Sequence, residues 1–243
     1  MERLARVIAR LDATLDWPLL GQLYCSEGGE DFFCEEQRDA LVESGMEFAQ
    51  ELGARLGAAD SGGSSLYVGA AVFELLPALF ESIVLERQVT LLNLDQTETS
   101  ELNRGLARVA EETGVVLPRV EICSLARLSA SEFDHLWMTS VLTDPDAFPA
   151  LHDLSYERGG TELGTNRGDL QADCTAATQL IREALNRVTP AFWLTTTDEE
   201  LTLFESECEA RSLSIDVPES GRLSGIVGDP VRHCFVEPLA PSE

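Results

Sequence analysis

Hydrophobic side chains recur at spacings of three and four residues over two stretches near the N-terminus. The first stretch spans residues 4–15 and the second spans residues 41–56. Because an α-helix has about 3.6 residues per turn, this spacing places the apolar side chains on one face. We therefore predict two amphipathic helices in the first third of the chain.

From residue 65 onward, short apolar runs alternate with helical patterns. The predicted strands are residues 65–68, 89–94, 119–123, 133–140 and 191–196. The predicted helices are residues 76–86, 98–113, 170–188 and 201–211. Strands that alternate with helices are typical of a parallel sheet with crossover helices. We therefore predict an α/β, Rossmann-like fold with a mostly parallel sheet and helices on both faces.

The two ends of this pattern indicate where the domain begins and how it ends. Turn-forming residues fill positions 58–65, and we place a domain boundary there. Residues 1–60 are then an N-terminal helical extension or lid, and residues 61–243 are the Rossmann-like domain. Two short apolar runs, 223–227 and 231–236, flank Gly228-Asp229-Pro230 and predict a C-terminal antiparallel hairpin.

The net charge of the chain limits the classes of partner that we expect. The 243 residues include 43 acidic and 17 basic side chains, for a net charge of −26, and every basic residue is an arginine. A field of that sign repels phosphate backbones and anionic lipids, so we expect neither nucleic acid nor a membrane as partner. The absence of lysine excludes Schiff-base chemistry and a P-loop lysine.

Neither a signal peptide nor a long apolar span is visible in the sequence, so we expect a cytoplasmic protein. The six cysteines form no C-x-x-C pair, which favours reduced thiols. The three histidines lack the spacing of a metal site, and we predict none.

A glycine follows the first predicted strand. Gly69 and Ala70 stand where the chain turns from this strand into a helix, and such turns can hold the polar end of a nucleotide-type ligand. The second strand ends at Asn93-Leu94-Asp95, where related folds use an acidic side chain to hold ribose hydroxyls. Two alternatives stay open: Gly69 could form a turn without a ligand, and Asp95 could cap the next helix.

On these residues, the chain resembles the class I S-adenosylmethionine-dependent methyltransferases over roughly residues 60–240. The resemblance implies S-adenosyl-L-methionine as the cofactor. It implies that Gly69 and Ala70 approach the methionine moiety, that Asn93 or Asp95 binds the ribose, that Ser124 and Leu125 flank the adenine, and that Thr139 lies at the end of the fourth strand.

The sequence also departs from that family. Tyr67 stands where the family has an acidic residue, and Gly69-Ala70-Ala71-Val72-Phe73 replaces its G-x-G-x-G pattern. The N/D-P-P-Y motif of enzymes that methylate bases or glutamine is missing after the fourth strand, in agreement with the charge.

Several further residues are candidates for the substrate site. His152, next to Asp153, is the candidate general base, whereas we interpret His135 and His233 as structural. Arg158 and Arg167 could bind a substrate carboxylate. The aromatic residues Tyr24, Phe32 and Phe33 could cover a ligand pocket or pack the helices on the sheet.

Two functional hypotheses follow. The first is an S-adenosylmethionine-dependent methyltransferase acting on a small molecule or a protein side chain. The second is a non-catalytic domain of the same fold that serves as a binding or assembly module. The polar ends of strands two and four favour the first, and the single glycine favours the second. The sequence does not decide whether the protein is an enzyme, nor its oligomeric state.

Overall fold

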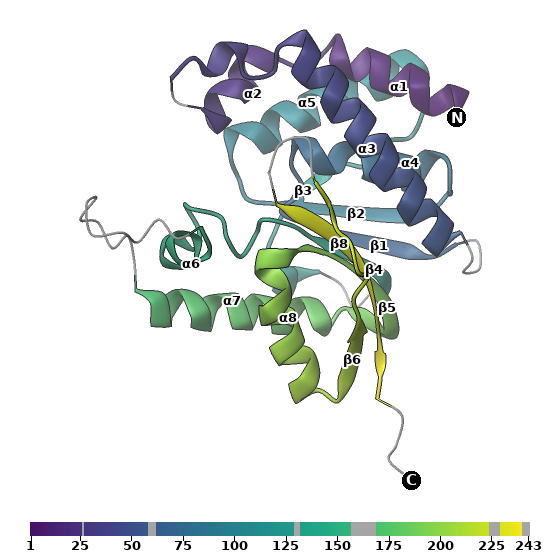
Figure 1. Cartoon of the computed structure of the whole chain (residues 1–243). Coiled ribbons are helices and arrows are strands. Elements are labelled where there is room, and N and C mark those ends of the chain that lie inside the picture. Colours follow the sequence, from purple (N-terminus) through teal and green to yellow (C-terminus); the bar gives the residue numbers. More distant parts are fainter. Residues whose placement is uncertain (26, 58–61, 129–131, 157–168, 224–228, 240–243) are drawn as a thin grey trace. The chain divides into compact units, whose positions relative to one another are not determined.

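The computed structural model describes residues 1–25, 27–57, 62–128, 132–156, 169–223 and 229–239, and Figure 1 shows its elements. The chain divides into two compact units, and each is described by itself. The first comprises Met1–Ser124 with Leu223–Gly228, and the second comprises Leu125–Arg222 with Asp229–Glu243.

The first unit contains a parallel sheet in which β2 lies between β1 and β3. Tyr67 of β1 is paired with Leu91 of β2, which in turn is paired with Val120 of β3. The elements of this unit are α1 (Glu2–Asp12), α2 (Trp17–Tyr24), η1 (Gly29–Asp31), α3 (Glu35–Leu56), β1 (Ser64–Val68), α4 (Val72–Ile83), β2 (Gln88–Asn93), α5 (Thr97–Thr113) and β3 (Val120–Ile122).

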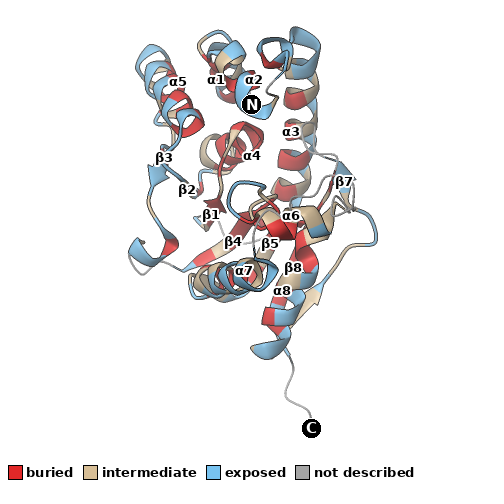
Figure 2. Cartoon of the chain, turned by 90° about the vertical axis from the view of Figure 1, so that its left-hand side faces the viewer, coloured by how far each residue is buried: buried red, intermediate tan, exposed pale blue. Residues whose placement is uncertain are grey.

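The helices of the first unit share one core with its strands. Helix α3 packs on α4, and α1 packs on both α4 and α5. The rings of Phe48 in α3 and Phe73 in α4 are perpendicular, with centroids 5.4 Å apart. Buried residues run along the facing sides of α3 and α4 in Figure 2. The N-terminal helices are therefore held to this unit by apolar packing.

The second unit contains parallel and antiparallel pairs of strands. β4 and β5 are parallel, whereas β8 is antiparallel to both β5 and β6. Its elements are η2 (Leu125–Arg127), β4 (Phe133–Met138), α6 (Pro149–Ser155), α7 (Leu170–Leu185), β5 (Val188–Thr197), α8 (Asp198–Ala210), β6 (Leu213–Asp216) and β8 (Pro230–Pro238), and β7 (Arg222–Leu223) spans the boundary between the units.

The predicted fold class, α/β with a mostly parallel sheet and a C-terminal antiparallel pair, is confirmed. The five predicted strands and the four predicted helices of the core are all present, with shifted ends. The domain boundary at residue 61 stays a prediction. None of the helices in the described ranges is both long and apolar enough to span a bilayer.

The short elements α2, η1, η2, α6 and β6 were not predicted. Helix α2 has eight residues and includes Gly21, so its apolar pattern is too short to stand out. Strand β6 has only four residues, none of them fully buried, and it pairs antiparallel with β8. The predicted strand 223–227 begins in β7, which also pairs with β8. Of that predicted strand, residues 224–227 lie outside the described residues.

Local hydrogen bonds and backbone angles explain the shifted ends. Helix α4 begins at Val72, four residues earlier than predicted, because the Glu74 carboxylate accepts a hydrogen bond from the Ala71 amide over 3.0 Å. β4 ends at Met138, because Ser140 has a positive φ of 55°. β5 begins at Val188, which pairs with Phe133 of β4.

Candidate functional site

The turn after β1 brings three of the predicted site residues together. Gly69 has a φ of 75°, a left-handed conformation that favours glycine. The Ala70 amide donates to the Leu92 carbonyl over 2.9 Å, and the Ala70 carbonyl accepts from the Asn93 side chain over 2.9 Å. Asn93 therefore ties the glycine turn to the end of β2.

Asp95 and Ser124 of the predicted site are exposed. Among the described residues, Asp95 has no hydrogen bond or ion pair. Helix α5 begins at Thr97 and has Gln96 as its N-cap, so Asp95 lies one residue before the cap. A carboxylate just beyond β2 that has no partner among the described residues is available to accept hydrogen bonds from ligand hydroxyl groups.

A buried glutamate of α5 that the sequence interpretation missed, Glu98, reaches the beginning of α4 with its carboxylate. Glu98 is 8% exposed, and its Oε1 accepts from the Tyr24 hydroxyl over 2.7 Å and from the Val72 amide over 3.2 Å. Burial raises the pKa of Glu98, and burial together with Glu98 raises the pKa of Tyr24. The Tyr24 phenol therefore stays protonated and donates.

This glutamate changes what the helix terminus can bind. The Ala71 and Val72 amides at the beginning of α4 already interact with the carboxylates of Glu74 and Glu98. A helix N-terminus attracts anions, and here side chains of the chain itself use that attraction. A ligand with a carboxylate would meet a filled site, whereas an ammonium group would meet Glu98.

The aromatic residues of the N-terminal segment form one cluster. The rings of Tyr24 and Phe32 are stacked with centroids 5.7 Å apart, and the Phe33 ring lies edge-on to both. Phe33 is 3% exposed, so it packs the segment. Tyr24 also makes a polar contact, because its hydroxyl donates to Glu98 of α5, whose carboxylate lies at the beginning of α4, after the glycine turn.

Tyr67, at the family's acidic position, belongs to the core. It is 0% exposed, and its hydroxyl donates to Glu81 of α4. Arg87 forms an ion pair with Glu81 over 2.9 Å, and the Ser65 hydroxyl donates to the same carboxylate. This buried network replaces the family's acid with a structural hydrogen bond.

In the second unit, a second buried glutamate organises the loop after β4. Glu200 is 0% exposed, and its Oε1 accepts from the Leu142 amide over 2.5 Å and from the Thr143 amide over 3.2 Å. Burial raises the pKa of Glu200 to about 7. In the sequence it looked like one of three ordinary acidic residues in the first turn of α8.

The loop that Glu200 holds orients His152. The Nδ1 atom of His152 lies 2.8 Å from the Thr143 carbonyl oxygen. Because a carbonyl oxygen only accepts, Nδ1 carries the proton, and Nε2 of the neutral ring is the basic nitrogen. The sequence interpretation of His152 as a base is compatible with this tautomer and stays a prediction.

The other predicted residues of the second unit are structural neighbours. Thr139 is 7% exposed and accepts from the Trp137 indole over 3.1 Å, and Leu125 is 3% exposed in η2. His135 and His233 both bond to the buried Thr195 hydroxyl. Arg158 and Arg167 lie outside the described residues.

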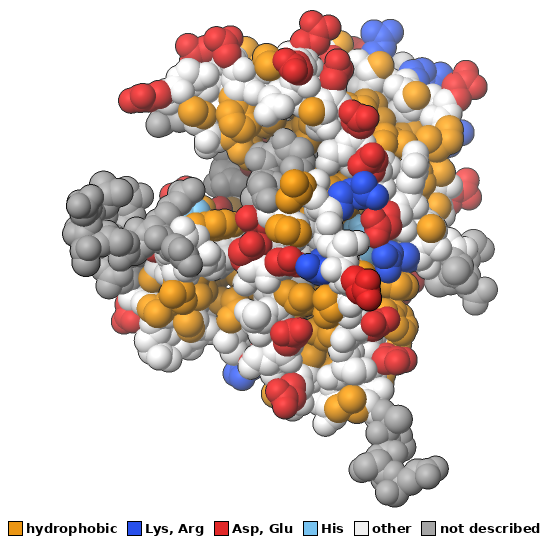
Figure 3. All heavy atoms as spheres, in the orientation of Figure 1, with side chains coloured by type: hydrophobic (Ala, Val, Ile, Leu, Met, Phe, Trp, Pro, Cys, Tyr) orange, Lys and Arg blue, Asp and Glu red, His pale blue; other side chains and the backbone are white. Residues whose placement is uncertain are grey.

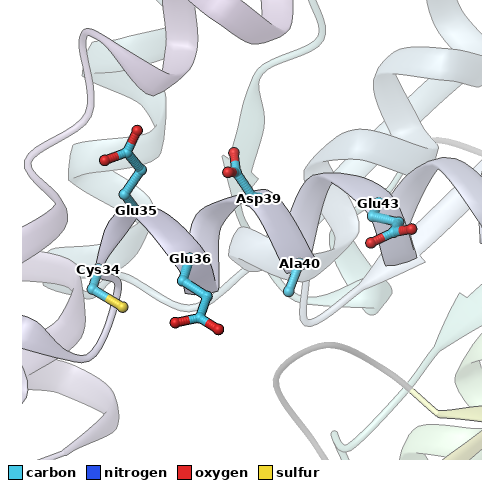
Figure 4. Close-up of a pocket in the computed structure, with 6 residues that line it drawn as sticks. All are labelled: Cys34, Glu35, Glu36, Asp39, Ala40 and Glu43. Carbon is cyan, nitrogen blue, oxygen red and sulfur yellow. The ribbon is translucent and has the colours of Figure 1, made fainter.

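Two surface hollows do not resemble a substrate site. The one in Figure 4 is lined by Cys34 and by acidic side chains along α3, which extend from a single helix toward solvent. The other has Arg3 and Arg6 beside the C-terminal ends of α4 and α5, whose carbonyl groups attract cations. Acidic side chains are spread over the face of the protein shown in Figure 3, in agreement with its net charge of −26.

Comparison with known proteins shows the fold. No protein-family model and no curated protein matches the chain. Among solved structures, magnesium protoporphyrin IX methyltransferase from Synechocystis PCC 6803, solved with bound S-adenosylmethionine, matches with a TM-score of 0.51 and 12% identity over 93% of this chain and 99% of that one. A proposed O-methyltransferase from Klebsiella pneumoniae matches with a TM-score of 0.50 and 10% identity over 92% and 99%. The chain has the methyltransferase fold.

The methyltransferase fold implies S-adenosylmethionine, and the residues of the first unit can be tested for it. Gly69 places no side chain in its left-handed turn, and Asp95 offers a carboxylate with no partner in the described part of the chain. Both fit a nucleoside. The amino-acid end fits in one orientation, with its ammonium toward Glu98, because the helix amides are filled.

Proposed function

We propose that the protein is an S-adenosylmethionine-dependent methyltransferase that acts on a small molecule or a protein side chain. The observation that carries the proposal is the left-handed Gly69 turn, tied to the end of β2 and followed by the exposed Asp95, in a chain with the methyltransferase fold. The net charge of −26 favours these substrates over nucleic acid.

Methyl transfer requires the protein mainly to align the methyl donor with the acceptor. The cofactor, when bound, supplies a methyl group that its sulfonium already activates. Gly69 and Ala70 would hold its amino-acid part, Asp95 or Asn93 its ribose, and Ser124 with Leu125 its adenine. Glu200 orders the loop that aligns His152, whose Nε2 then takes a proton from the substrate.

Calorimetric titration with S-adenosylhomocysteine tests cofactor binding. We expect saturable binding to the wild-type protein and a loss of at least about tenfold in affinity for Gly69→Val, because a branched side chain would fill the turn. Gly114→Val is the matched control: Gly114 has a φ of 67° and caps α5. It carries the same backbone strain, about 1–2 kcal/mol, so it separates lost stability from lost binding.

One observation favours the second function, a non-catalytic binding or assembly module. The Asn93 side chain is engaged by the Ala70 carbonyl and the Leu94 amide, and Glu98 is bound to the Val72 amide, so the site is partly satisfied from within. If neither the wild-type protein nor Glu98→Ala binds S-adenosylhomocysteine at millimolar concentration, the methyltransferase proposal fails and this one stands.

A further inference from the structure

Two buried carboxylates lie at the beginning of α4, close to the glycine turn. Glu98 of α5 is 8% exposed, and Glu74 of α4 is 4% exposed. The Glu74 carboxylate accepts from the Ala71 amide over 3.0 Å. Oε1 of Glu98 accepts from the Val72 amide over 3.2 Å. Both amides belong to the short segment that follows Gly69, so the first unit alone supplies this arrangement.

The negative charge of Glu98 has no cationic partner in the described part of the chain. Its two hydrogen bonds come from neutral donors, the Tyr24 hydroxyl and the Val72 amide, and both reach Oε1. Oε2 accepts no hydrogen bond from any residue of the described ranges. Burial raises the pKa of Glu98, and no cation counters this effect. Because buried charges are normally paired, the second oxygen of Glu98 indicates a ligand that carries a positive charge and donates hydrogen bonds.

Of the two charged groups at the amino-acid end of S-adenosylmethionine, the ammonium matches this environment. It donates hydrogen bonds and compensates the charge of a carboxylate. The carboxylate of the ligand would need the amides at the helix terminus, which Glu74 and Glu98 already use. It would also face the like charges of these two side chains. The two ends of the ligand are therefore distinguished by charge.

We propose that Glu98 is the specificity-determining residue of the cofactor site, and that the site recognises the amino-acid end of its ligand through the ammonium group alone. This step rests on the methyltransferase function proposed above, which places the ligand at the Gly69 turn. The ligand class is then an adenosyl sulfonium or thioether that carries a primary amine. The carboxylate is dispensable, so decarboxylated S-adenosylmethionine is a ligand of the same site.

Calorimetric titration with three ligands tests the role of the ammonium. The ligands are S-adenosylhomocysteine, the same molecule without its carboxylate, and the same molecule without its amino group. We expect removal of the amino group to weaken binding to the wild-type protein by at least about tenfold, because a charge-assisted hydrogen bond to a buried carboxylate is lost. The decarboxylated ligand should bind at least as tightly as S-adenosylhomocysteine, because no free donor awaits the carboxylate.

Two variants assign this preference to Glu98. Glu98→Gln keeps the shape of the side chain and removes its charge, so the preference for the amino group should fall to less than about threefold. Glu111→Gln is the matched control, on an exposed position about 20 Å further along α5. It removes the same charge beyond the screening length of about 8 Å at 0.15 M salt, and it should keep the full preference.

The preference compares two ligands on one protein, so a general loss of stability does not produce it. Thermal unfolding shows whether Glu98→Gln is folded, and the three ligands on the wild-type protein decide if it is not. Equal affinity for all three ligands, a larger loss without the carboxylate than without the amino group, or an unchanged preference in folded Glu98→Gln would overturn the role of Glu98 and leave the methyltransferase function standing.

Two further outcomes bear on the methyltransferase function itself. Binding of the decarboxylated ligand without binding of S-adenosylhomocysteine would keep the role of Glu98 and reject S-adenosylmethionine as the cofactor. If none of the three ligands binds at millimolar concentration, both the role of Glu98 and the methyltransferase function are rejected.

Discussion

Replacing Arg87 with methionine is expected to lower the free energy of unfolding by about 3–5 kcal/mol. The ion-paired side chains of Arg87 and Glu81 are 3% and 0% exposed. Methionine fills a similar volume but leaves the buried Glu81 carboxylate without its ion-pair partner, although the hydroxyl groups of Ser65 and Tyr67 still donate to it. The cost is that of an uncompensated buried charge, and urea unfolding measures it.

Two further variants separate the effect of the unpaired charge from the effect of lost packing. Arg87→Met combined with Glu81→Gln should recover much of the loss, because the unpaired charge is gone. Arg55→Met breaks the Arg55–Glu51 pair, whose side chains are 27% and 33% exposed, and should cost less than about 1 kcal/mol. A loss for Arg87→Met no larger than for Arg55→Met would show that the buried pair contributes little.

Glu200→Gln is expected to stabilise the protein above neutral pH and to be nearly neutral at pH 4 to 5. In the folded state, burial raises the pKa of Glu200 from 4.5 to about 7. Between these values the folded protein holds a proton that the unfolded chain has lost, so the glutamate makes stability fall as pH rises. Glutamine can still accept from the Leu142 and Thr143 amides.

The size of the expected stability difference follows from the pKa shift of Glu200. The stability of Glu200→Gln relative to wild type should rise by up to about 3 kcal/mol between about pH 4.5 and pH 8. Glu205→Gln, exposed on the same helix, should show a much flatter difference. Unfolding in urea at several pH values gives both curves. A difference that does not depend on pH for Glu200→Gln would mean that Glu200 titrates normally.

Local sequence patterns determined the sheet, its connecting helices and the glycine turn. Alternating apolar runs predicted five strands of the core, because a buried parallel strand needs a continuous apolar stretch. Gly69 marked the turn, since its left-handed φ favours glycine. The short elements α2 and β6 escaped prediction because eight and four residues carry too little pattern.

Only the tertiary structure decided how the site is filled. Glu98 meets the Val72 amide across 26 residues, and Glu200 meets the Leu142 amide across 58. Each looked in the sequence like an acid in the first turn of its own helix, a favourable place by itself. Whether such a carboxylate faces solvent or enters a neighbouring helix terminus depends on which elements pack together, and that is a property of the folded chain.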